Sequence, residues 1–313
     1  MTHLSADQRE EQYALRHDVA AVRLPRDVVR ATGADAVTFL QGQLSQDLAA
    51  MAEGDVASAL LLEPGGKVVA WLRAWRRDGD EVLMDVDAGS GQAVLDRLNR
   101  FKLRVQVDLE LLSWELVSVR GPRTREPNCP PTVLPVPVDW AGLHGIDLLG
   151  PEVSVPQGVR EVGPEALHAV RVEAGWPAMG TELGPQLDPL VIPAEAGSWL
   201  VDASVSFTKG CYTGQELVAR VDSRGSNTPR HLRGLLVTGE VAPEPGAEVL
   251  VEGQGRGALT SVARSAELGA PVALGYLHRS VEPGRSVTLR WLGDDGQPVV
   301  GDAVVRDLPL VSG

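Results

Sequence analysis

The stretch that organises this chain reads Lys209-Gly-Cys-Tyr-Thr-Gly-Gln-Glu216, and it places a cation, a thiol, two glycines, a carboxamide and a carboxylate within eight residues. The next residues have a helical pattern, because Leu217, Val218 and Val221 share one face and Gly225 suits a helix C-terminus. We therefore expect a loop that leads into a helix beginning near Thr213 or Gly214.

The chemistry of this stretch is open to two interpretations. A helix N-terminus presents backbone N–H groups and a positive partial charge, which together favour anions. Lys209 adds a full positive charge, and such surroundings push the pKa of a thiol down toward reactive thiolate, which would make Cys211 a nucleophile. The alternative is a tight turn with a small buried thiol, since cysteine also packs as a hydrophobic residue.

Composition places the chain among ordinary globular proteins. Its 313 residues are enough for two or three domains, and 43% of them are hydrophobic and 23% charged. No apolar run approaches the roughly 20 residues that a membrane-spanning helix needs. The segment 2–18 is polar and lacks the apolar core of a signal peptide, so we expect a cytoplasmic protein with a short, loose N-terminal tail.

Charge and cysteine usage exclude several classes of function. The formal net charge of −13 argues against broad binding to a nucleic-acid backbone, which needs clustered lysine and arginine. Two cysteines, Cys129 and Cys211, do not make a zinc or iron–sulfur site by themselves, and a cytoplasmic location disfavours a disulfide between them. The six histidines show no HxxH or HxxxH spacing, so we do not expect a metal enzyme.

The first third of the chain predicts strands mixed with isolated helices, which is typical of an α+β layer. Gly33 opens an expected helix in which Leu40, Leu44 and Leu48 recur every four residues. A hairpin is predicted around Pro64-Gly-Gly66. The expected strands are 22–30, 56–62, 67–75, 81–86, 104–107 and 111–119, and a second helix is expected over 88–101.

The middle of the chain is rich in proline and predicts little regular structure. A short strand is expected over 145–149, and residues 176–208 look irregular. The exception is a well-marked helix over 163–175, with Pro164 in its first turn and Gly175 closing it. Glu173 lies near the helix C-terminus, where a negative charge is unfavourable. It is either a solvated glutamate or a carboxylate aimed at a ligand.

From Leu232 onward the pattern changes to short strands separated by turns with glycine and proline. Six strands at this density indicate a small antiparallel barrel or sandwich, with a domain boundary near residue 229. The expected strands are 234–238, 248–252, 259–264, 272–278, 286–291 and 301–305.

These residues together resemble a known family. The octapeptide, followed by Val218-Ala-Arg220 and Arg224-Gly225, is similar to the signature of the YgfZ-type folate-binding proteins, which are relatives of the glycine-cleavage T-protein, an aminomethyltransferase. The resemblance covers roughly residues 20 to 313. It extends to the segments 34–47, 64–67, 171–175, 257–261 and 273–277.

The resemblance implies a three-part ring around a central hole in which tetrahydrofolate binds. Residues 1–50 with 118–228 would form a first folate-binding α/β subdomain, residues 51–117 a second α/β subdomain, and residues 229–313 a C-terminal antiparallel β-barrel. It further implies that Glu173 meets the polar edge of the pterin, a task that suits a carboxylate because it accepts two parallel N–H bonds.

The remaining site residues also follow from the resemblance. Arg220 or Arg230 would meet the glutamate carboxylates of the folate, and Arg171, Gln215 and Glu216 complete the expected cofactor-binding set. Cys211 would carry thiol chemistry next to the pterin, with Lys209 stabilising its thiolate.

One departure separates this chain from the T-protein. The T-protein carries a catalytic aspartate in a G-G-x-x-D-D pattern after the hairpin glycines. Here the chain reads Gly65-Gly-Lys-Val-Val-Ala-Trp71, so Val69 and Ala70 stand where carboxylates would be. Aminomethyl transfer to folate then lacks its obvious polar partner, and the T-protein also lacks the K-G-C form of the loop.

Three functions remain open. The first is a tetrahydrofolate-binding accessory factor for iron–sulfur proteins, including those that thiomethylate tRNA, with Cys211 and Lys209 as its reactive residues. The second is a tetrahydrofolate-dependent methyl- or aminomethyltransferase, and the third is a binding module whose ring is purely structural. The expected partners are a folate and iron–sulfur client proteins, without direct nucleic-acid or membrane contact, and we expect a monomer.

Overall fold

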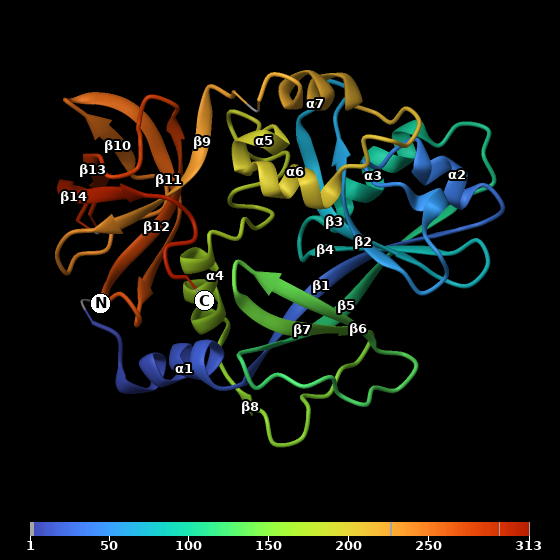
Figure 1. The fold of residues 1–313 in the computed structure, drawn as a ribbon, viewed down its shortest axis with the longest axis horizontal. Coiled ribbons are helices and arrows are strands. Elements are labelled where there is room, and N and C mark those ends of the chain that lie inside the picture. The colour runs from blue at the N-terminus through green and yellow to red at the C-terminus, as the bar shows by residue number, and fades with distance from the viewer. Residues whose placement is uncertain (1–2, 226, 294, 313) are drawn as a thin grey trace. The chain divides into compact units, whose positions relative to one another are not determined.

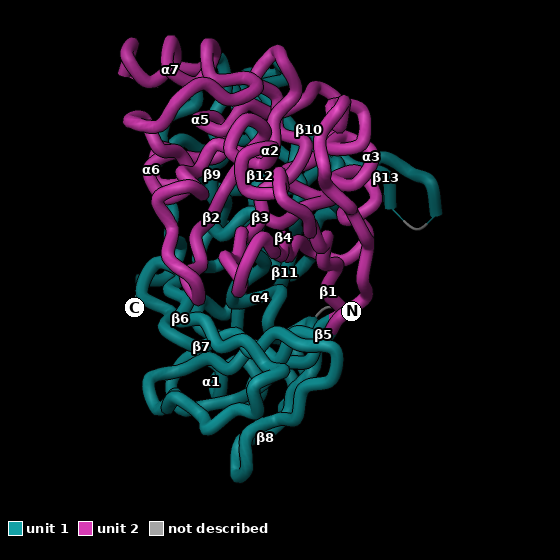
Figure 2. Tube along the Cα trace, turned by 90° about the vertical axis from the view of Figure 1, so that its right-hand side faces the viewer, with its two compact units in different colours: residues 1–24, 115–177, 229–313 teal, residues 25–114, 178–228 magenta. Residues whose placement is uncertain are grey.

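A computed structural model describes residues 3–225, 227–293 and 295–312 of the chain (Figure 1). Two compact units share these residues (Figure 2). Unit 1 is made of Met1–Leu24, Glu115–Pro177 and Pro229–Gly313, and unit 2 of Pro25–Trp114 and Ala178–Thr228. Strands β1 (Ala20–Thr32) and β5 (Asp108–Arg120) each run from one unit into the other.

Unit 2 is built on an antiparallel sheet with the strand order β2-β3-β4-β1. The strands are β2 (Val56–Leu62), β3 (Val68–Arg76) and β4 (Val82–Asp87), together with residues 25–32 of β1. Its helices are α2 (Ala36–Gln41), the 3₁₀ turn η1 (Leu48–Ala50), α3 (Gly91–Phe101), α5 (Pro193–Ala196), α6 (Ser198–Ser204) and α7 (Gln215–Asp222).

The hairpin of β2 and β3 in unit 2 turns at the predicted glycines. Gly66 adopts a φ of +74°, and its N–H donates to the carbonyl of Glu63 at 2.7 Å. Only glycine takes such a conformation without steric cost, so the Pro64-Gly-Gly66 signal was a reliable marker of this turn.

Unit 1 contains the N-terminal helix, a small antiparallel sheet and the helix that carries Glu173. The sheet has the order β5-β7-β6, and β8 pairs in parallel with the start of β1. Leu15 of the first helix packs in one core with Leu167, Val170 and Trp140. The elements are α1 (Ala6–His17), β6 (Leu134–Trp140), β7 (Leu143–Gly150), β8 (Arg160–Glu161) and α4 (Pro164–Ala174).

The C-terminal part of unit 1 is a closed antiparallel barrel with the strand order β10-β11-β12-β9-β14-β13. Alternating residues such as Val287, Leu289 and Trp291 fill its core, as the period of two in a strand requires. Its strands are β9 (Arg230–Val237), β10 (Glu248–Val251), β11 (Gln254–Ser265), β12 (Ala270–His278), β13 (Ser286–Leu292) and β14 (Pro298–Arg306).

The structure confirms the predicted α+β class and the C-terminal antiparallel barrel. Helix α4 and all six barrel strands lie where the sequence indicated. The division into the segments 1–50 with 118–228, 51–117 and 229–313 stays a prediction.

Three local predictions were wrong. The loose tail expected over residues 2–18 instead contains helix α1, Ala6–His17. The helix expected from Gly33 through Leu48 ends at Gln41, because Leu44 instead forms a β-bridge with Leu61 and Leu48 begins a 3₁₀ turn. The strand expected over 104–107 is irregular, with Arg104 at a φ of +56°. Smaller differences concern residues 176–208, which contain α5 and α6, and residues 88–90, which precede α3.

Candidate functional site

Lys209 is the best-anchored residue of the octapeptide. Its Nζ donates to the backbone carbonyl oxygens of Gln41, Leu44 and Gln46, at 2.6, 2.7 and 2.8 Å. These bonds use all three donors of the ammonium group and hold the segment between α2 and η1 against the loop. Burial lowers the pKa of Lys209 to about 8, while Asp47 acts in the opposite direction. A catalytic role beside this structural one stays a prediction.

In the loop the thiol of Cys211 is exposed, and the neighbouring residues are held in place by contacts with the rest of unit 2. Cys211 is an exposed free cysteine, whereas its neighbour Tyr212 is buried, and burial raises the pKa of Tyr212 to about 12. The Lys209 Nζ lies 5.2 Å from the centre of the Tyr212 ring, within the range of a cation–π contact. The loop backbone is also tied down, since Thr213 N–H donates to the Gly42 carbonyl at 3.2 Å.

Helix α7 begins at Gln215 as predicted, and Gly214 makes this start possible. Gly214 has a φ of +86°, and a Cβ placed there would lie 2.9 Å from the Glu63 carbonyl oxygen. On the other side of the same contact, a Cβ at Gly66 would lie 2.7 Å from Leu217. Two glycines therefore let α7 and the β2–β3 hairpin approach closely. The helix is capped at Ser223, so the predicted stop at Gly225 lies one residue beyond the position that follows the cap, and Gly225 turns the chain with a φ of +70°.

The predicted cofactor-binding residues on α7 have different exposure. Gln215 is half-buried, and Glu216 and Arg220 are exposed. Their expected contacts with folate stay predictions.

The hairpin positions that distinguish the T-protein are part of the core of unit 2. Val69 and Ala70 are both buried in β3. Neither position presents a polar group, so these two residues offer a reacting ligand no acid, base or charge.

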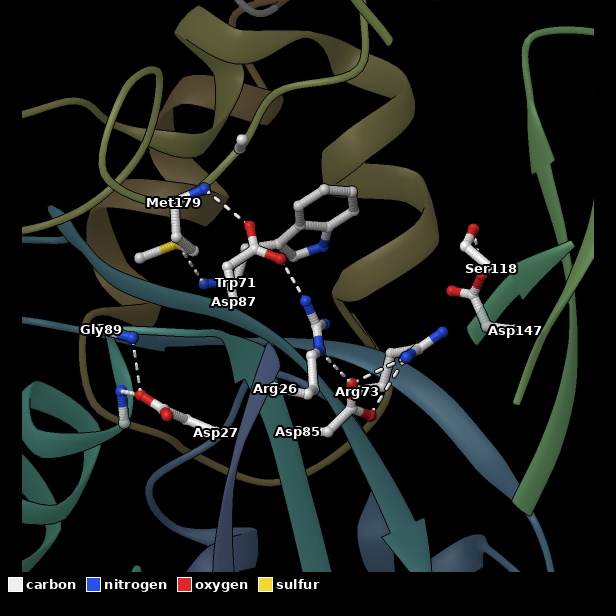
Figure 3. Close-up of polar contacts among 12 residues, drawn as sticks. Arg26, Asp27, Trp71, Arg73, Asp85, Asp87, Gly89, Ser118, Asp147 and Met179 are labelled. Atoms are coloured by element: carbon white, nitrogen blue, oxygen red, sulfur yellow. Dashed lines mark hydrogen bonds and ion pairs between the residues drawn. The ribbon is translucent and has the colours of Figure 1, made fainter. Parts of the chain in front are cut away.

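A buried charge cluster that the sequence motifs did not predict lies in the same sheet (Figure 3). Asp85 of β4 is completely buried and accepts hydrogen bonds from Arg26 Nε at 2.8 Å, Arg73 Nη2 at 2.8 Å and Trp75 Nε1 at 2.5 Å. Burial alone would raise the pKa of Asp85, but Arg73 and Arg26, with the hydrogen bonds from Arg73 and Trp75, hold it at about 2. Asp85 thus remains charged at neutral pH.

The cluster continues to Asp87 at the end of β4. Asp87 pairs with Arg26 and accepts from the Met179 N–H at 2.9 Å, and Met179 Sδ in turn accepts from the Trp71 N–H at 3.3 Å (Figure 3). The signal available in the sequence was a carboxylate at alternate positions of an apolar strand. The arginines opposite it depend on strand register, in which Arg73 pairs with Asp85 and Arg26 with Asp87.

Glu173 on α4 is the most enclosed of the predicted binding residues, with 1% of its surface exposed. Its Oε2 accepts from Arg16 Nη2 of helix α1 at 2.5 Å, and its Oε1 accepts from Ser265 Oγ of β11 at 2.5 Å. The interpretation of Glu173 as a solvated glutamate is therefore wrong. Contact with a ligand stays a prediction.

Arg171 lies two residues before Glu173 on α4 and faces the barrel. Its guanidinium donates to the Trp176 carbonyl and to Ser261 Oγ, each at 2.7 Å. Arg230 on β9 stacks over the Tyr276 ring at 5.0 Å from its centre. Both arginines thus have structural partners within unit 1, and their predicted binding roles are untested.

A pocket of about 270 Å³ opens beside Glu173. Helix α1 supplies most of its wall, and the rest comes from α4 and the turn between β11 and β12. Its lining residues are Arg9, Glu10, Gln12, Tyr13, Arg16, Val170, Glu173, Ala266 and Glu267.

The predicted site residues thus belong to both units. Glu173, Arg171 and Arg230 lie in unit 1, and Lys209, Cys211, Gln215, Glu216 and Arg220 lie in unit 2. Within the described part of the chain, no helix is both long enough and apolar enough to cross a membrane.

Comparison with known proteins supports the fold assignment. Residues 230–309 match the model of the glycine cleavage T-protein C-terminal barrel domain. The crystal structure of aminomethyltransferase T from Bartonella henselae is similar with a TM-score of 0.77 and 20% identity, over 97% of this chain and 89% of that one.

Similar proteins include a YgfZ protein, an aminomethyltransferase and an uncharacterized protein. An uncharacterized protein of Haemophilus influenzae is 30% identical over 203 residues, 64% of this chain and 67% of that protein. The tRNA-modifying protein YgfZ of Hamiltonella defensa is 26% identical over 223 residues, 64% of this chain and 65% of its own. An aminomethyltransferase of Streptomyces avermitilis is 27% identical over 310 residues, 86% and 81% of the two chains.

The barrel, the mixed sheets and these matches define a T-protein-like protein. Within that class, the K-G-C loop and the relatives are decisive. The chain belongs to the YgfZ-type family of the glycine-cleavage T-protein-like superfamily.

Proposed function

We propose that this chain is a cytoplasmic, monomeric, tetrahydrofolate-binding accessory protein that supports iron–sulfur cluster assembly or repair. Its link to tRNA thiomethylation would be indirect, through iron–sulfur client enzymes, because a net charge of −13 disfavours direct contact with RNA. The observation that carries the proposal is the K-G-C loop, in which the three bonds of Lys209 fix a backbone that leaves Cys211 exposed.

The hairpin supports an accessory role over transfer chemistry. Catalysis of aminomethyl transfer needs a charged or basic group at the reacting centre. Val69 and Ala70 are apolar and buried, so this chain has no carboxylate at the position where the T-protein has one.

Glu173 supports the choice of folate as the ligand. A carboxylate has about four acceptor positions, and among the described residues Arg16 and Ser265 use one on each oxygen. The remaining acceptor positions suit the N–H groups of an aminopyrimidine edge, for which Glu173 borders a pocket.

Calorimetric titration with tetrahydrofolate tests the binding step. We expect micromolar binding to wild type and at least a tenfold loss of affinity in Glu173→Gln, because the amide keeps the shape but loses half of the acceptor capacity. The matched control is Glu165→Gln, an exposed residue in the first turn of the same helix. Absence of binding to wild type would remove both folate hypotheses together.

Genetic complementation tests the role of the thiol. In a strain that lacks its own copy of this protein, we expect Cys211→Ser to leave iron–sulfur enzyme activities low, whereas Cys129→Ser restores them. Cys129 is a suitable control because it is half-buried in a separate loop. Full complementation by Cys211→Ser would show that the thiol has no essential chemistry.

A second candidate is a tetrahydrofolate-dependent aminomethyl- or methyltransferase. It is favoured by the aminomethyltransferase relative, which aligns with 86% of this chain. Formation of methylenetetrahydrofolate or methyltetrahydrofolate from a methylamine donor would establish this activity in place of the accessory role.

A further inference from the structure

The pocket beside Glu173 has a second charged residue in its wall. Arg16 projects from helix α1, and its side chain is 8% exposed, so the pocket is lined by a buried arginine as well as a buried carboxylate. Arg9, Tyr13 and Glu267 line the same pocket and are exposed. The charge of Arg16 is balanced by Glu173, and a pocket walled by such a pair suits an uncharged polar ring.

The protein leaves part of the hydrogen-bonding capacity of Arg16 unused. A guanidinium has five N–H donors, and Nη2 donates to Glu173. Among the described residues, none accepts a hydrogen bond from the buried Nε. Leaving a buried donor unpaired costs about 1–3 kcal/mol. An arginine with unused donors next to a glutamate with unused acceptors is an arrangement that a ligand with both kinds of group would complete.

Size limits the part of the ligand that enters. A pocket of about 270 Å³ is small for a drug-sized molecule but suits a bicyclic ring. The aminobenzoyl and glutamate parts of a folate would remain outside it.

We propose that Arg16 and Glu173 together recognise the 2-amino-4-oxopyrimidine edge of a reduced pterin, with Glu173 accepting from the ring N–H groups and Arg16 donating to the 4-oxo oxygen. This rests on the proposed function and deepens it, because it assigns a specificity-determining role to helix α1. Arginine only donates, so a 4-amino group would place N–H against N–H and be rejected.

Two ligands that differ in the group at C4, and therefore in whether N3 carries a hydrogen, test the assignment. 6-Methyltetrahydropterin carries the 4-oxo group, and its 2,4-diamino analogue carries an amine instead. We expect wild type to bind the 4-oxo compound at least tenfold more tightly. In Arg16→Gln the ratio should fall at least threefold below its wild-type value, because a carboxamide can present either its oxygen or its NH₂ group to the substituent at C4. The preference of Glu173 for the N3–H of the 4-oxo ring remains. Asp7→Asn, at an exposed position of the same helix outside the pocket, is the matched control and should keep the wild-type ratio.

The ratio of the two affinities separates recognition from a structural role. If Arg16 only holds Glu173 in place, Arg16→Gln weakens both ligands equally and the ratio stays at its wild-type value, which overturns the proposal. Arg16→Lys keeps the positive charge as a pure donor, so it should retain the preference and is the variant to use if Arg16→Gln does not fold. Loss of the preference in the lysine variant would also count against the assignment.

The same titrations distinguish this proposal from the more general one. Wild type that binds tetrahydrofolate without preferring the 4-oxo ring refutes the role of Arg16 and leaves folate binding intact. Wild type that binds neither tetrahydrofolate nor the pterin refutes both.

Discussion

Asp85 accepts from Arg26, Arg73 and Trp75 in a fully buried position of β4, so two neighbouring arginines share its single negative charge. In Asp85→Asn both arginines lose this buried counter-charge, and Arg26 keeps its ion pair with Asp87. We expect the free energy of unfolding, measured in urea, to fall by about 3–5 kcal/mol, as is typical when one partner of a buried ion pair is removed. Asp80→Asn on the exposed turn before β4 is the control and should stay within about 0.5 kcal/mol of wild type.

The same residue predicts a pH dependence of stability. The pKa of Asp85 is about 2 in the folded protein against an ordinary value of 3.8, so between these pH values the unfolded chain binds more protons. The stabilisation is present above about pH 4 and is lost as the pH falls toward 2, by roughly 2–3 kcal/mol at 1.36 kcal/mol per pKa unit. Urea titrations from pH 5 to 2 should show a shallower decline for Asp85→Asn than for wild type. Parallel curves would contradict this account.

At the scale of elements, the contact between α7 and the β2–β3 hairpin depends on glycine at two facing positions. Gly214→Ala would force a Cβ to within 2.9 Å of the Glu63 carbonyl at a φ of +86°. We expect a loss of stability of about 1–3 kcal/mol, because strain of this kind is seldom relieved in place. Gly210→Ala is a control in the same loop, since its Cβ would meet nothing within 4 Å. Thermal unfolding should therefore separate the two variants, and equal melting temperatures would show that the contact yields easily.

Local signals predicted those elements whose limits are set locally. Pro164 and Gly175 bracket helix α4, and alternation with turn residues marked the barrel strands. The leucine repeat at Leu40, Leu44 and Leu48 predicted a longer helix than the one that forms, because a lysine distant in the sequence binds the chain there. The carbonyl of Leu44 accepts a hydrogen bond from Lys209, and Leu44 forms a β-bridge with Leu61 instead of continuing the helix. Tertiary contacts of this kind override a helical period that the sequence shows correctly.

The candidate site shows the same limit more strongly. Glu173, Lys209 and Cys211 were found because a family resemblance marked them. Arg16, which binds Glu173, lies 157 residues away, and Lys209 reaches carbonyl groups 163 to 168 residues away. Nothing in local composition indicates such pairs, and the structure was needed to show that the lysine anchors a backbone and that the glutamate borders a pocket.

At the scale of the whole molecule, the two units share two strands, and this bears on how the chain unfolds. Multidomain proteins often unfold in separate steps. Here β1 and β5 each run through both units without interruption. Melting either unit therefore removes the support of strand residues that the other unit uses. We expect a single cooperative transition, seen at the same urea concentration by circular dichroism and by tryptophan fluorescence.

Two core variants, one in each unit, test this coupling. Asp85→Asn weakens unit 2, and Leu289→Ala opens a cavity in the barrel core of unit 1, at a cost of about 2–5 kcal/mol. If the shared strands couple the units, each substitution moves the whole transition, and both spectroscopic probes report the same midpoint. If the units are independent, each variant unfolds in two steps: the unit that carries the substitution unfolds at a lower urea concentration, and the other unit unfolds at its wild-type midpoint. The second result would mean that unfolding only one half of β1 and β5, up to the unit boundary, costs little free energy. A ligand bound to unit 1 could then stabilise that unit without stabilising unit 2.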